Sequence, residues 1–565
     1  MKSESESEER KKMKIMVTKI KKLTARCLLC CGVAAALASC SDNWNEHYDA
    51  LTVDNGTLWQ AIAADNNLSN FARVLQACGY DQVLSGSQTF SVFAPTNAAL
   101  TTAEADSLVK VFQQQAATGI RTDDNTVVRQ FIQNHIAMFK QPVSSLTNDS
   151  ITLMNGKYTV LTATTIGNDE LLSTNALYNN GLLFTVARKL DYFPNIFEYL
   201  GHDSDLDSVY QFLNSYSVYE FNDAKSVPGE IVDGLTIYLD SVTELNNMML
   251  NALGLINAED STYWFVAPTN SEWSRLVSEY EPYFNYPNSV AKRDSMVYTN
   301  TRQAIIGGAF FSRTMNPDEA FSDSAVSTLA SSALVRTLLD MDYNYFTYYR
   351  PFDKGGIFDG TTDIVCSNGH VRKASTFNVS KFQTFMQTIK VEAEDILYQD
   401  TIIDAVDPLV VREVTSDNPF YGKVSRNTFV EVIPDPATAQ VTVSFKVPSV
   451  LSNVKYNIYA VFVPATAYDP LAVSETTKPN IVRTTIYWND QNGREARRIF
   501  NRNISNQPDV VDTLLLAEDF TFPTSSYGLA QPQARVQLKS NVTSRQTATN
   551  SGTLRLDCII IKPQE

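Results

Sequence analysis

The nonapeptide TFSVFAPTN at residues 89–97 sets the fold of the N-terminal half of this chain. Its apolar residues alternate with small or polar ones, which predicts a strand, and the proline at position 95 ends that strand. Thr96 and Asn97 commonly begin helices, because their side chains accept hydrogen bonds from free backbone N–H groups. We therefore predict a buried strand that turns directly into a helix.

A second copy of this motif, YWFVAPTN, stands at residues 263–270. The dipeptide Arg-Gln follows the motif proline by 34 residues in both copies, at 129–130 and at 302–303. A repeat of about 175 residues is long enough to be a whole domain, and much longer than one unit of a solenoid. The chain therefore contains two related domains in tandem.

These copies resemble the fasciclin family, which has a Phe-Ala-Pro-Thr-Asn turn, a histidine near a helix end and an Asn-Gly turn before a strand. His135 matches the histidine position, whereas the second copy has Gly308 there. Phe184 stands where the family usually has a second histidine, and the Asn-Gly pair recurs more loosely at 368–369. The motif residues that we assign to the fold are Pro95, Thr96, Asn97, His135, Asn180, Gly181, Pro268, Thr269 and Asn270.

The resemblance implies two fasciclin-like α/β domains that serve adhesion and protein interaction. We expect the first at residues 56–197 and a divergent second one, with insertions, at 198–398. The motif residues are predicted to shape the fold, because Gly in an Asn-Gly turn adopts positive φ and Thr or Asn caps a helix. His135 is accordingly expected in a hydrogen-bonded core position.

The sequence pattern changes at about residue 400. Apolar residues alternate with polar ones over 441–447 and 456–462, and four further strand-like runs follow, with little sign of helix. This predicts an all-β sandwich at 399–565. Its last strand, Leu554–Ile560, resembles that of galactose-binding-like jelly rolls. The predicted fold class is therefore α+β: two fasciclin-like domains followed by a β-sandwich.

The N-terminus has the layout of an export signal. A basic stretch precedes a short apolar run, Cys27–Leu37, which is too short to span a bilayer. The sequence LASC at 37–40 resembles a bacterial lipobox, which implies a signal at 1–39, lipidation of Cys40 and an acidic tether at 40–55. Ser41, Asp42 and Asn43 resemble the surface-export signal of lipoproteins in Gram-negative glycan-degrading bacteria. We expect an outer-membrane lipid anchor facing the exterior, with the periplasmic face as the alternative.

Charge and cysteine content limit the partners. The formal net charge is −16, and residues 1–39 contain nine Lys or Arg and four Asp or Glu, so the remainder is near −21. A chain this acidic is not expected to bind nucleic acid, which requires basic patches. Cys78, Cys366 and Cys558 lie far apart after the signal, which favours buried thiols over disulfides or a metal site.

The sequence contains few residues suited to catalysis. It has four histidines, and no zinc-protease, nucleophile-elbow or phosphate-loop motif. We therefore predict no enzyme activity, no cofactor and no metal. A hydrolase site built from distant residues of the β-rich region is the alternative, since such sites are recognised by geometry.

Two tyrosine-rich stretches, 280–286 and 343–349, are the candidate ligand-binding residues. Exposed aromatic rings stack on sugars or anchor protein interfaces, although core packing would produce the same composition. The named candidates are Tyr283, Tyr345, Tyr348 and Tyr349. They place binding on the second domain or at its junction with the sandwich.

The predicted function is a lipid-anchored surface protein that binds or adheres to a protein or glycan ligand. The alternative is an accessory glycan-binding lipoprotein beside an outer-membrane importer, which rests on analogy of layout.

Overall fold

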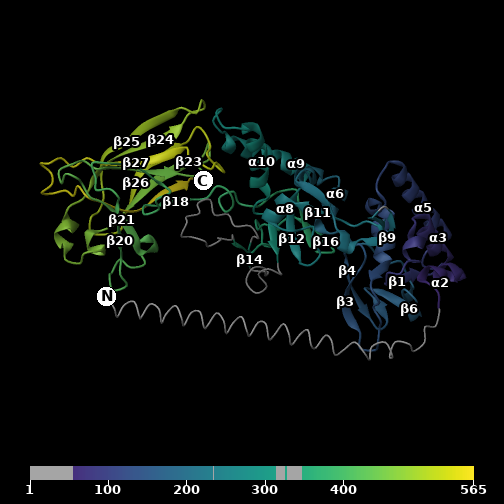
Figure 1. Ribbon diagram of the computed structural model, residues 1–565. Helices are drawn as coiled ribbons and strands as arrows, with labels where there is room; N and C mark the ends of the chain where they lie inside the picture. The colour runs from purple at the N-terminus through teal and green to yellow at the C-terminus, as the bar shows by residue number, and fades with distance from the viewer. Residues whose placement is uncertain (1–54, 233, 313–324, 328–346) are drawn as a thin grey trace, which may run out of the picture. The chain divides into compact units, whose positions relative to one another are not determined.

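The computed structural model describes residues 55–232, 234–312, 325–327 and 347–565 (Figure 1). The chain divides into two compact units. The first contains the chain up to Met154 together with Thr159–Leu190 and Gly229–Leu239; the second contains Asn155–Tyr158, Asp191–Pro228 and Asp240–Glu565. No helix in the described part of the chain is long and apolar enough to cross a membrane.

A seven-stranded sheet forms the centre of the first unit, in the order β2-β1-β7-β6-β5-β4-β3. The second and third strands in this order, β1 (Phe90–Pro95) and β7 (Gly181–Val186), run parallel and are almost entirely buried. The predicted strand ending at Pro95 is thus confirmed. The helix expected directly after it, at Thr96 and Asn97, instead begins at Thr102, because Thr101 provides the cap. The other strands are β2 (Ile136–Met138), β3 (Asn148–Thr152), β4 (Tyr158–Thr162), β5 (Thr165–Ile166) and β6 (Asp169–Tyr178).

Two helices of the first unit begin at capping residues. Thr57 caps α2 (Leu58–Ala64) and Thr101 caps α5 (Thr102–Ala117), each in a capping box that satisfies two free N–H groups. Asp65 ends α2, and its side chain caps the turn that follows. The remaining helical segments are α3 (Ser69–Ala77), α4 (Tyr80–Val83), a π-helical turn (Val128–Ile132) and a 3-10 turn (Gln133–His135).

The second copy repeats this strand arrangement. Its sheet has the order β13-β12-β17-β16, with β12 (Tyr263–Pro268) parallel to β17 (Gly369–Ala374). Tyr263 pairs with Gly369 as Phe90 pairs with Gly181 in the first copy. The remaining elements are β13 (Phe310–Ser312), β14 (Ala325–Ser327), β15 (Thr347–Tyr349), β16 (Thr362–Cys366), α6 (Ile196–His202), α7 (Asp207–Asn214), α8 (Met248–Leu253), α9 (Asn270–Tyr280) and α10 (Arg293–Ile306).

An insertion of four strands lies between α7 and α8, where the first copy has only a short turn between α3 and α4. The strands form two separate two-stranded pairs, β8 with β11 and β9 with β10. They are β8 (Ser217–Phe221), β9 (Val227–Val232), β10 (Leu235–Asp240) and β11 (Thr243–Asn247). This insertion distinguishes the second copy from the first.

The C-terminal part of the second unit is a two-sheet β structure, drawn in green to yellow in Figure 1. One sheet has the order β20-β21-β28-β23-β26, with β18 also on β28, and the other has the order β19-β22-β27-β24-β25. The strands are β18 (Ile389–Glu392), β19 (Gln399–Ile403), β20 (Val410–Glu413), β21 (Thr428–Val432), β22 (Thr442–Val447), β23 (Lys455–Phe462), β24 (Ile481–Asn489), β25 (Glu495–Ser505), β26 (Asp512–Thr521), β27 (Ala534–Ser540) and β28 (Leu554–Pro563).

The alternating apolar residues of these strands point inward. All four apolar residues of 441–447 are buried, as are Tyr456, Ile458, Ala460 and Phe462. Because β18 pairs with β28, the sheet already begins before residue 399, the predicted start of the sandwich. The three cysteines of the described chain are free and buried, as expected.

Candidate functional site

The asparagine of each Asn-Gly pair holds three segments of backbone together. Asn180 accepts a hydrogen bond from Leu58 N (2.8 Å) and donates to Leu84 O (2.8 Å) and Gly86 O (2.9 Å). Both ends of its side-chain amide are therefore used inside the domain. Its role is to fix the start of α2 against the strand that follows the turn.

Asn368 makes the same three bonds in the second copy. It accepts from Ile196 N (2.9 Å) and donates to Ile256 O (2.8 Å) and Ala258 O (2.7 Å). The sequence predicts a tight turn at these positions. The structure adds a buried side-chain clamp that links segments more than one hundred residues apart.

The Pro-Thr-Asn turns also satisfy backbone groups. Asn97 accepts from Asn70 N (3.1 Å) and donates to Asn66 O (2.9 Å), and Asn270 likewise accepts from Ser208 N (2.8 Å) and donates to Ser204 O (2.8 Å). Thr269 caps α9 directly. Thr96 is buried and begins the turn that leads to α5. Pro95 and Pro268 end their strands.

Gly181 and Gly369 are restricted mainly by close packing. A Cβ on Gly181 would overlap the carbonyl oxygen of Phe90, and one on Gly369 would overlap that of Tyr263. The φ of Gly181 is 158°, close to extended, so the positive-φ turn predicted there is not the main reason for glycine. The neighbouring parallel strand leaves no room for a side chain.

His135 lies in the core of the first copy and is fully buried. Its Nδ1 is 2.7 Å from Phe131 O, and its Nε2 accepts a hydrogen bond from Leu190 N (3.0 Å). Burial lowers the pKa of the imidazole to about 4. With both nitrogens bonded to backbone, this histidine is placed to stabilise the fold.

The predicted tyrosines do not form one cluster. Tyr348 is buried, and its ring packs against Phe311 at 6.1 Å, so it faces the core and not a ligand. Tyr349 is 77% exposed. Tyr283 is partly buried, with Lys381 Nζ 3.2 Å from its hydroxyl. Tyr345 lies outside the described residues, as do Cys40, Ser41, Asp42 and Asn43.

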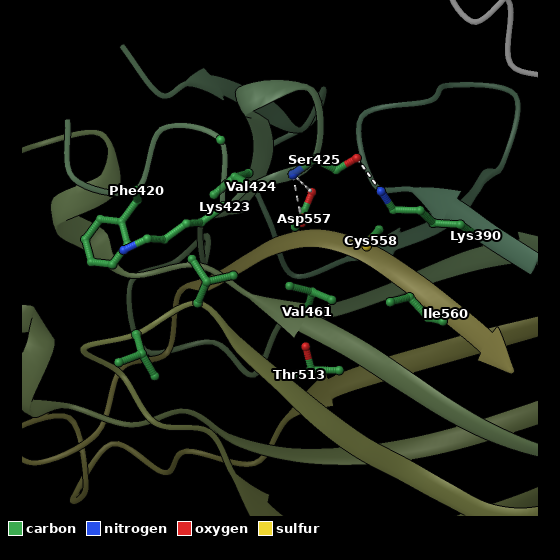
Figure 2. A pocket seen from close by; sticks show the side chains of 13 residues that line it. Lys390, Phe420, Lys423, Val424, Ser425, Val461, Thr513, Asp557, Cys558 and Ile560 are labelled. Atoms are coloured by element: carbon green, nitrogen blue, oxygen red, sulfur yellow. Dashed lines mark hydrogen bonds between the residues drawn. The ribbon is translucent and has the colours of Figure 1, made fainter. Parts of the chain in front are cut away.

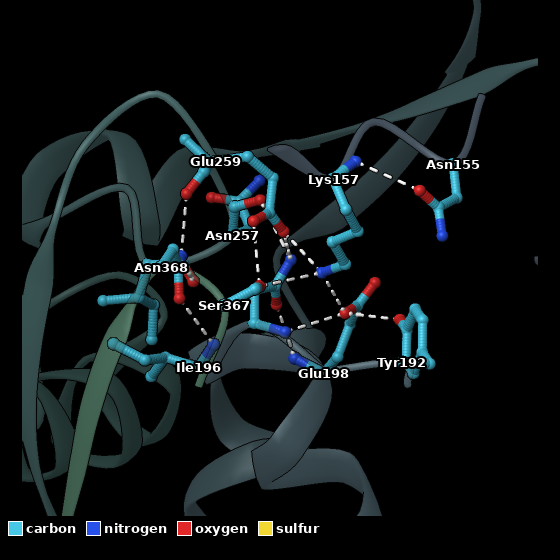
Figure 3. Close-up of polar contacts among 12 residues, drawn as sticks. Asn155, Lys157, Tyr192, Ile196, Glu198, Asn257, Glu259, Ser367 and Asn368 are labelled. Atoms are coloured by element: carbon cyan, nitrogen blue, oxygen red, sulfur yellow. Dashed lines mark hydrogen bonds and ion pairs between the residues drawn. The ribbon is translucent and has the colours of Figure 1, made fainter. Parts of the chain in front are cut away.

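An ion-pair network surrounds the buried ammonium of Lys157 in the second unit (Figure 3). Lys157 Nζ lies 2.7 Å from Glu198 Oε2, 2.5 Å from Glu259 Oε1 and 3.1 Å from Ser367 Oγ. Ser367 in turn donates to Glu259 Oε2 (2.8 Å). All three lysine donors are used, so this lysine has no free lone pair with which to accept a proton from Ser367. We assign the network to structure.

A cavity of about 670 Å³ lies on the six-stranded sheet of the sandwich (Figure 2). That volume is within the range of small-ligand sites. Strands β18, β23, β26 and β28 and the loop before β21 contribute its walls. The lining combines the ring of Phe420 with polar and apolar side chains. The polar ones are Lys390, Lys423, Ser425, Thr513 and Asp557, and the others are Val461, Val510, Val511, Cys558 and Ile560.

A β-bulge directs two neighbouring residues toward this cavity. Ala460 of β23 pairs with Ile559, but Phe462 pairs with Leu556, so β28 has one extra residue at this point. Asp557 and Cys558 lie in the bulge, and both line the cavity. Bulges often re-aim side chains beside binding sites.

The carboxyl of Asp557 is held by backbone and surrounded by charge. Ser425 N donates to its two oxygens at 3.2 and 3.1 Å. Burial raises the pKa of this carboxyl to about 7, and nearby Glu392 adds to the effect. Burial likewise raises the pKa of the Cys558 thiol. Figure 2 shows Ser425 between Asp557 and Lys390.

Within the described residues, one group of three side chains could hold a metal ion. The ligand atoms of Glu392, Asp557 and Cys558 lie within 4.8 Å of one another. Glu392 Oε2 has no hydrogen-bond partner, and carboxylate oxygens suit a hard cation such as calcium. Glu392 Oε1, however, already accepts from Ser425 (2.7 Å) and pairs with Lys390 Nζ (3.1 Å), so the chain supplies a positive charge of its own.

Sequence reasoning missed these residues of the sandwich. Glu392 and Asp557 are separated by more than 160 positions and belong to strands that pair only in the folded chain. One signal was available, because Asp557 stands among the apolar residues of the strand LRLDCIII, whose other charged residue is Arg555. A charged residue inside such a run is costly unless it is paired or functional.

Comparisons with known proteins were made for sequence and structure. Residues 66–191 match the Fasciclin domain model. No curated protein matches the chain. Among solved structures, it is similar to a FAS1 domain pair from the insect cell adhesion molecule Fasciclin I, with 10% identity over 56% of this chain and 98% of that chain and a TM-score of 0.19.

Carbohydrate-binding modules are also among the similar structures. The CBM22-1 xylan-binding domain from Paenibacillus barcinonensis shows 14% identity over 31% of this chain and 92% of that chain, with a TM-score of 0.19. The C-terminal CBM6 of LamC from Zobellia galactanivorans shows 13% identity over 31% and 99%, with a TM-score of 0.16. Similarity at this level does not bear on the ligand, which has to follow from the site itself.

Proposed function

We propose that this chain is a lipid-anchored, cell-surface binding or adhesion protein without catalytic activity, and that its ligand binds in the sandwich cavity. The Fasciclin domain at 66–191 and a second, divergent fasciclin-like domain would form the scaffold. In both copies the motif asparagines use their amide groups on backbone partners inside the domain. This supports a scaffold role for the copies and leaves the cavity as the better site for a ligand.

The cavity is the observation that supports this proposal most. Its floor is built on strands, whose residues are held more rigidly than those of loops. It offers one aromatic ring, aliphatic surface, two hydroxyls and charged groups in a space of about 670 Å³. A few polar groups in a largely apolar hollow are typical of ligand sites.

The same lining favours the second candidate, an accessory glycan-binding lipoprotein beside an outer-membrane importer. Sugars have apolar ring faces that stack on aromatic side chains, and hydroxyls that bond to polar ones. Phe420 supplies the ring, and Ser425 and Thr513 supply hydroxyls. The importer itself is inferred from the layout of the chain alone.

Filling the cavity tests the binding site. Thr513→Trp places a large ring in the cavity, and Glu518→Trp adds the same ring at an exposed position of the same strand, β26. We expect Thr513→Trp to lower affinity for a bound polysaccharide by at least about 10-fold, and Glu518→Trp to leave it unchanged. Equal affinities of the two variants would contradict the site. Turnover of the polysaccharide would contradict the absence of catalysis.

The lipid anchor has a separate test. Cys40→Ala should leave the protein unlipidated and released from membranes, and protease shaving of intact cells should remove the wild-type ectodomain. Membrane retention of the Cys40→Ala protein would refute the anchor.

A further inference from the structure

The charged groups that line the sandwich cavity differ in how they are neutralised. Lys390 Nζ pairs with Glu392 Oε1 at 3.1 Å, so its charge is balanced within the chain. Lys423 lines the same cavity, and among the described residues no carboxylate lies within ion-pair distance of it. Its ammonium lies over the face of the Phe420 ring, 5.6 Å from the ring centre.

The acid of the cavity does not neutralise Lys423. Asp557 accepts both of its hydrogen bonds from Ser425 N, on the side of the cavity where Lys390 lies. Figure 2 shows the Lys423 side chain extending away from Asp557 toward Phe420. The cavity therefore has a positively charged end that is unmatched by the chain.

This end is unusual for so acidic a protein. The whole chain has a formal net charge of −16, and a field of that sign repels anions at long range. Non-specific attraction of anions is therefore unfavourable, and an anion would bind here only through direct contact. A charge-assisted hydrogen bond from an ammonium is the contact that Lys423 offers.

We propose that the ligand is an acidic glycan, whose carboxylate or sulfate group pairs with Lys423 while a sugar ring stacks on Phe420. This inference rests on the proposed function, because it names the ligand of the same cavity. The ammonium of Lys423 lies over the Phe420 ring, 5.6 Å from its centre, so one sugar residue can reach both groups. The hydroxyl of Thr513 remains for a sugar hydroxyl, whereas that of Ser425 is already bonded to Glu392 and Lys390.

The test uses pairs of polymers that differ only in charge. Polygalacturonate is compared with its methyl ester, and dextran sulfate with dextran, by titration against the full chain. The first pair reports on carboxylate and the second on sulfate. At least one acidic polymer should bind about 10-fold or more tightly than its neutral counterpart, since a hydrogen bond to a charged group is worth that much.

Two lysine variants complete the experiment. Lys423→Gln should lose about 10-fold in affinity for the acidic polymer, whereas Lys455→Gln, an exposed lysine of β23 outside the cavity, should lose none. The melting temperature of each variant should equal that of the wild type. Equal binding of charged and neutral polymers, or full affinity in Lys423→Gln, would overturn the inference.

The failures of the two proposals can be told apart. If a neutral polymer binds and Thr513→Trp abolishes that binding, the cavity is the site but its ligand is not acidic. If no polymer of either pair binds, the acidic-glycan inference is overturned and the glycan-binding candidate falls with it.

Discussion

The two copies share the asparagine side chains that bond to backbone, but they differ in the side chains on the strand after the Asn-Gly pair, β7 in the first copy and β17 in the second. In the first copy Phe184 stacks on Phe93 at 4.9 Å inside an apolar cluster. In the second copy Arg372 occupies the register position of Phe184. Its guanidinium lies 4.8 Å from the ring of Trp264 and 3.8 Å from Asp363.

This difference shows which parts of the motif determine the fold. The position of Leu182 is His370 in the second copy, whose ring lies tilted against Trp264 at 4.4 Å, so this strand position accepts either an aliphatic or a polar side chain. The asparagine clamp and the glycine beside it are unchanged. Side chains on the faces of the sheet therefore differ between the copies with the residues that pack on them. The positions that bond to backbone or lie against a neighbouring strand keep the same residue, asparagine or glycine.

The largest expected effect is therefore loss of the clamp in either copy. Asn180→Ala and Asn368→Ala each leave three backbone groups without their partner, and we expect each to destabilise its own copy by about 3 kcal/mol or more. Hydrogen exchange resolved by peptide would locate the loss. Asn246→Ala, at an exposed position, is the matched control. Unchanged protection in both clamp variants would refute the shared role.

A smaller effect is expected from the adjacent glycines. Gly181→Ala and Gly369→Ala push a Cβ against the facing carbonyl, for an expected cost of about 1–3 kcal/mol. Gly119 has φ of +83° and open space around it, so Gly119→Ala isolates the cost of backbone conformation alone. Thermal melting compares the three. If Gly119→Ala costs as much as the other two, close strand packing is not the reason for glycine.

The smallest expected effect is a difference between the two copies in how their stability depends on pH. His135 has a folded pKa of about 4, whereas its unfolded pKa is near 6.5. Between these values the unfolded chain binds a proton that the folded chain does not, so stability falls as pH falls through this window. We expect a loss on the order of 1 kcal/mol at pH 5.5, confined to the first copy.

Substitution of the histidine checks the source of this effect. Gly308 occupies the equivalent place in the second copy and has nothing to titrate. His135→Gln should remove the pH dependence between pH 6.5 and 4 from the first copy. The same slope in His135→Gln as in the wild type would assign it to other groups.

Sequence patterns predicted those secondary-structure elements that are determined by residues close together in the sequence. The strand at 89–97, its second copy and the alternation at 441–447 follow from local periodicity and from proline and capping chemistry. The reason for Gly181 was not predictable, because the carbonyl that excludes a side chain belongs to a strand about ninety residues earlier.

The candidate site depended even more on distant contacts. The cavity forms where a bulge in β28 lies against the loop at 418–425. No residue spacing in the sequence predicts this contact. Aromatic composition pointed instead to the second copy, where Tyr348 turned out to pack in the core. Composition counts rings but does not say which of them face solvent.

The central claim is that the copies form the scaffold and the sandwich cavity binds the ligand. Paired melting and ligand titration of two single variants, Phe420→Ala and Tyr349→Ala, test it most directly. Both remove one accessible ring, the first in the cavity and the second on the second copy.

With polygalacturonate and dextran sulfate as probes, we expect the folded fraction of Phe420→Ala to bind about 30-fold more weakly, although loss of the ring's packing lowers its melting temperature, and Tyr349→Ala to bind like the wild type. The opposite pattern, with full affinity in Phe420→Ala and loss in Tyr349→Ala, would contradict the account and return the binding site to the second copy.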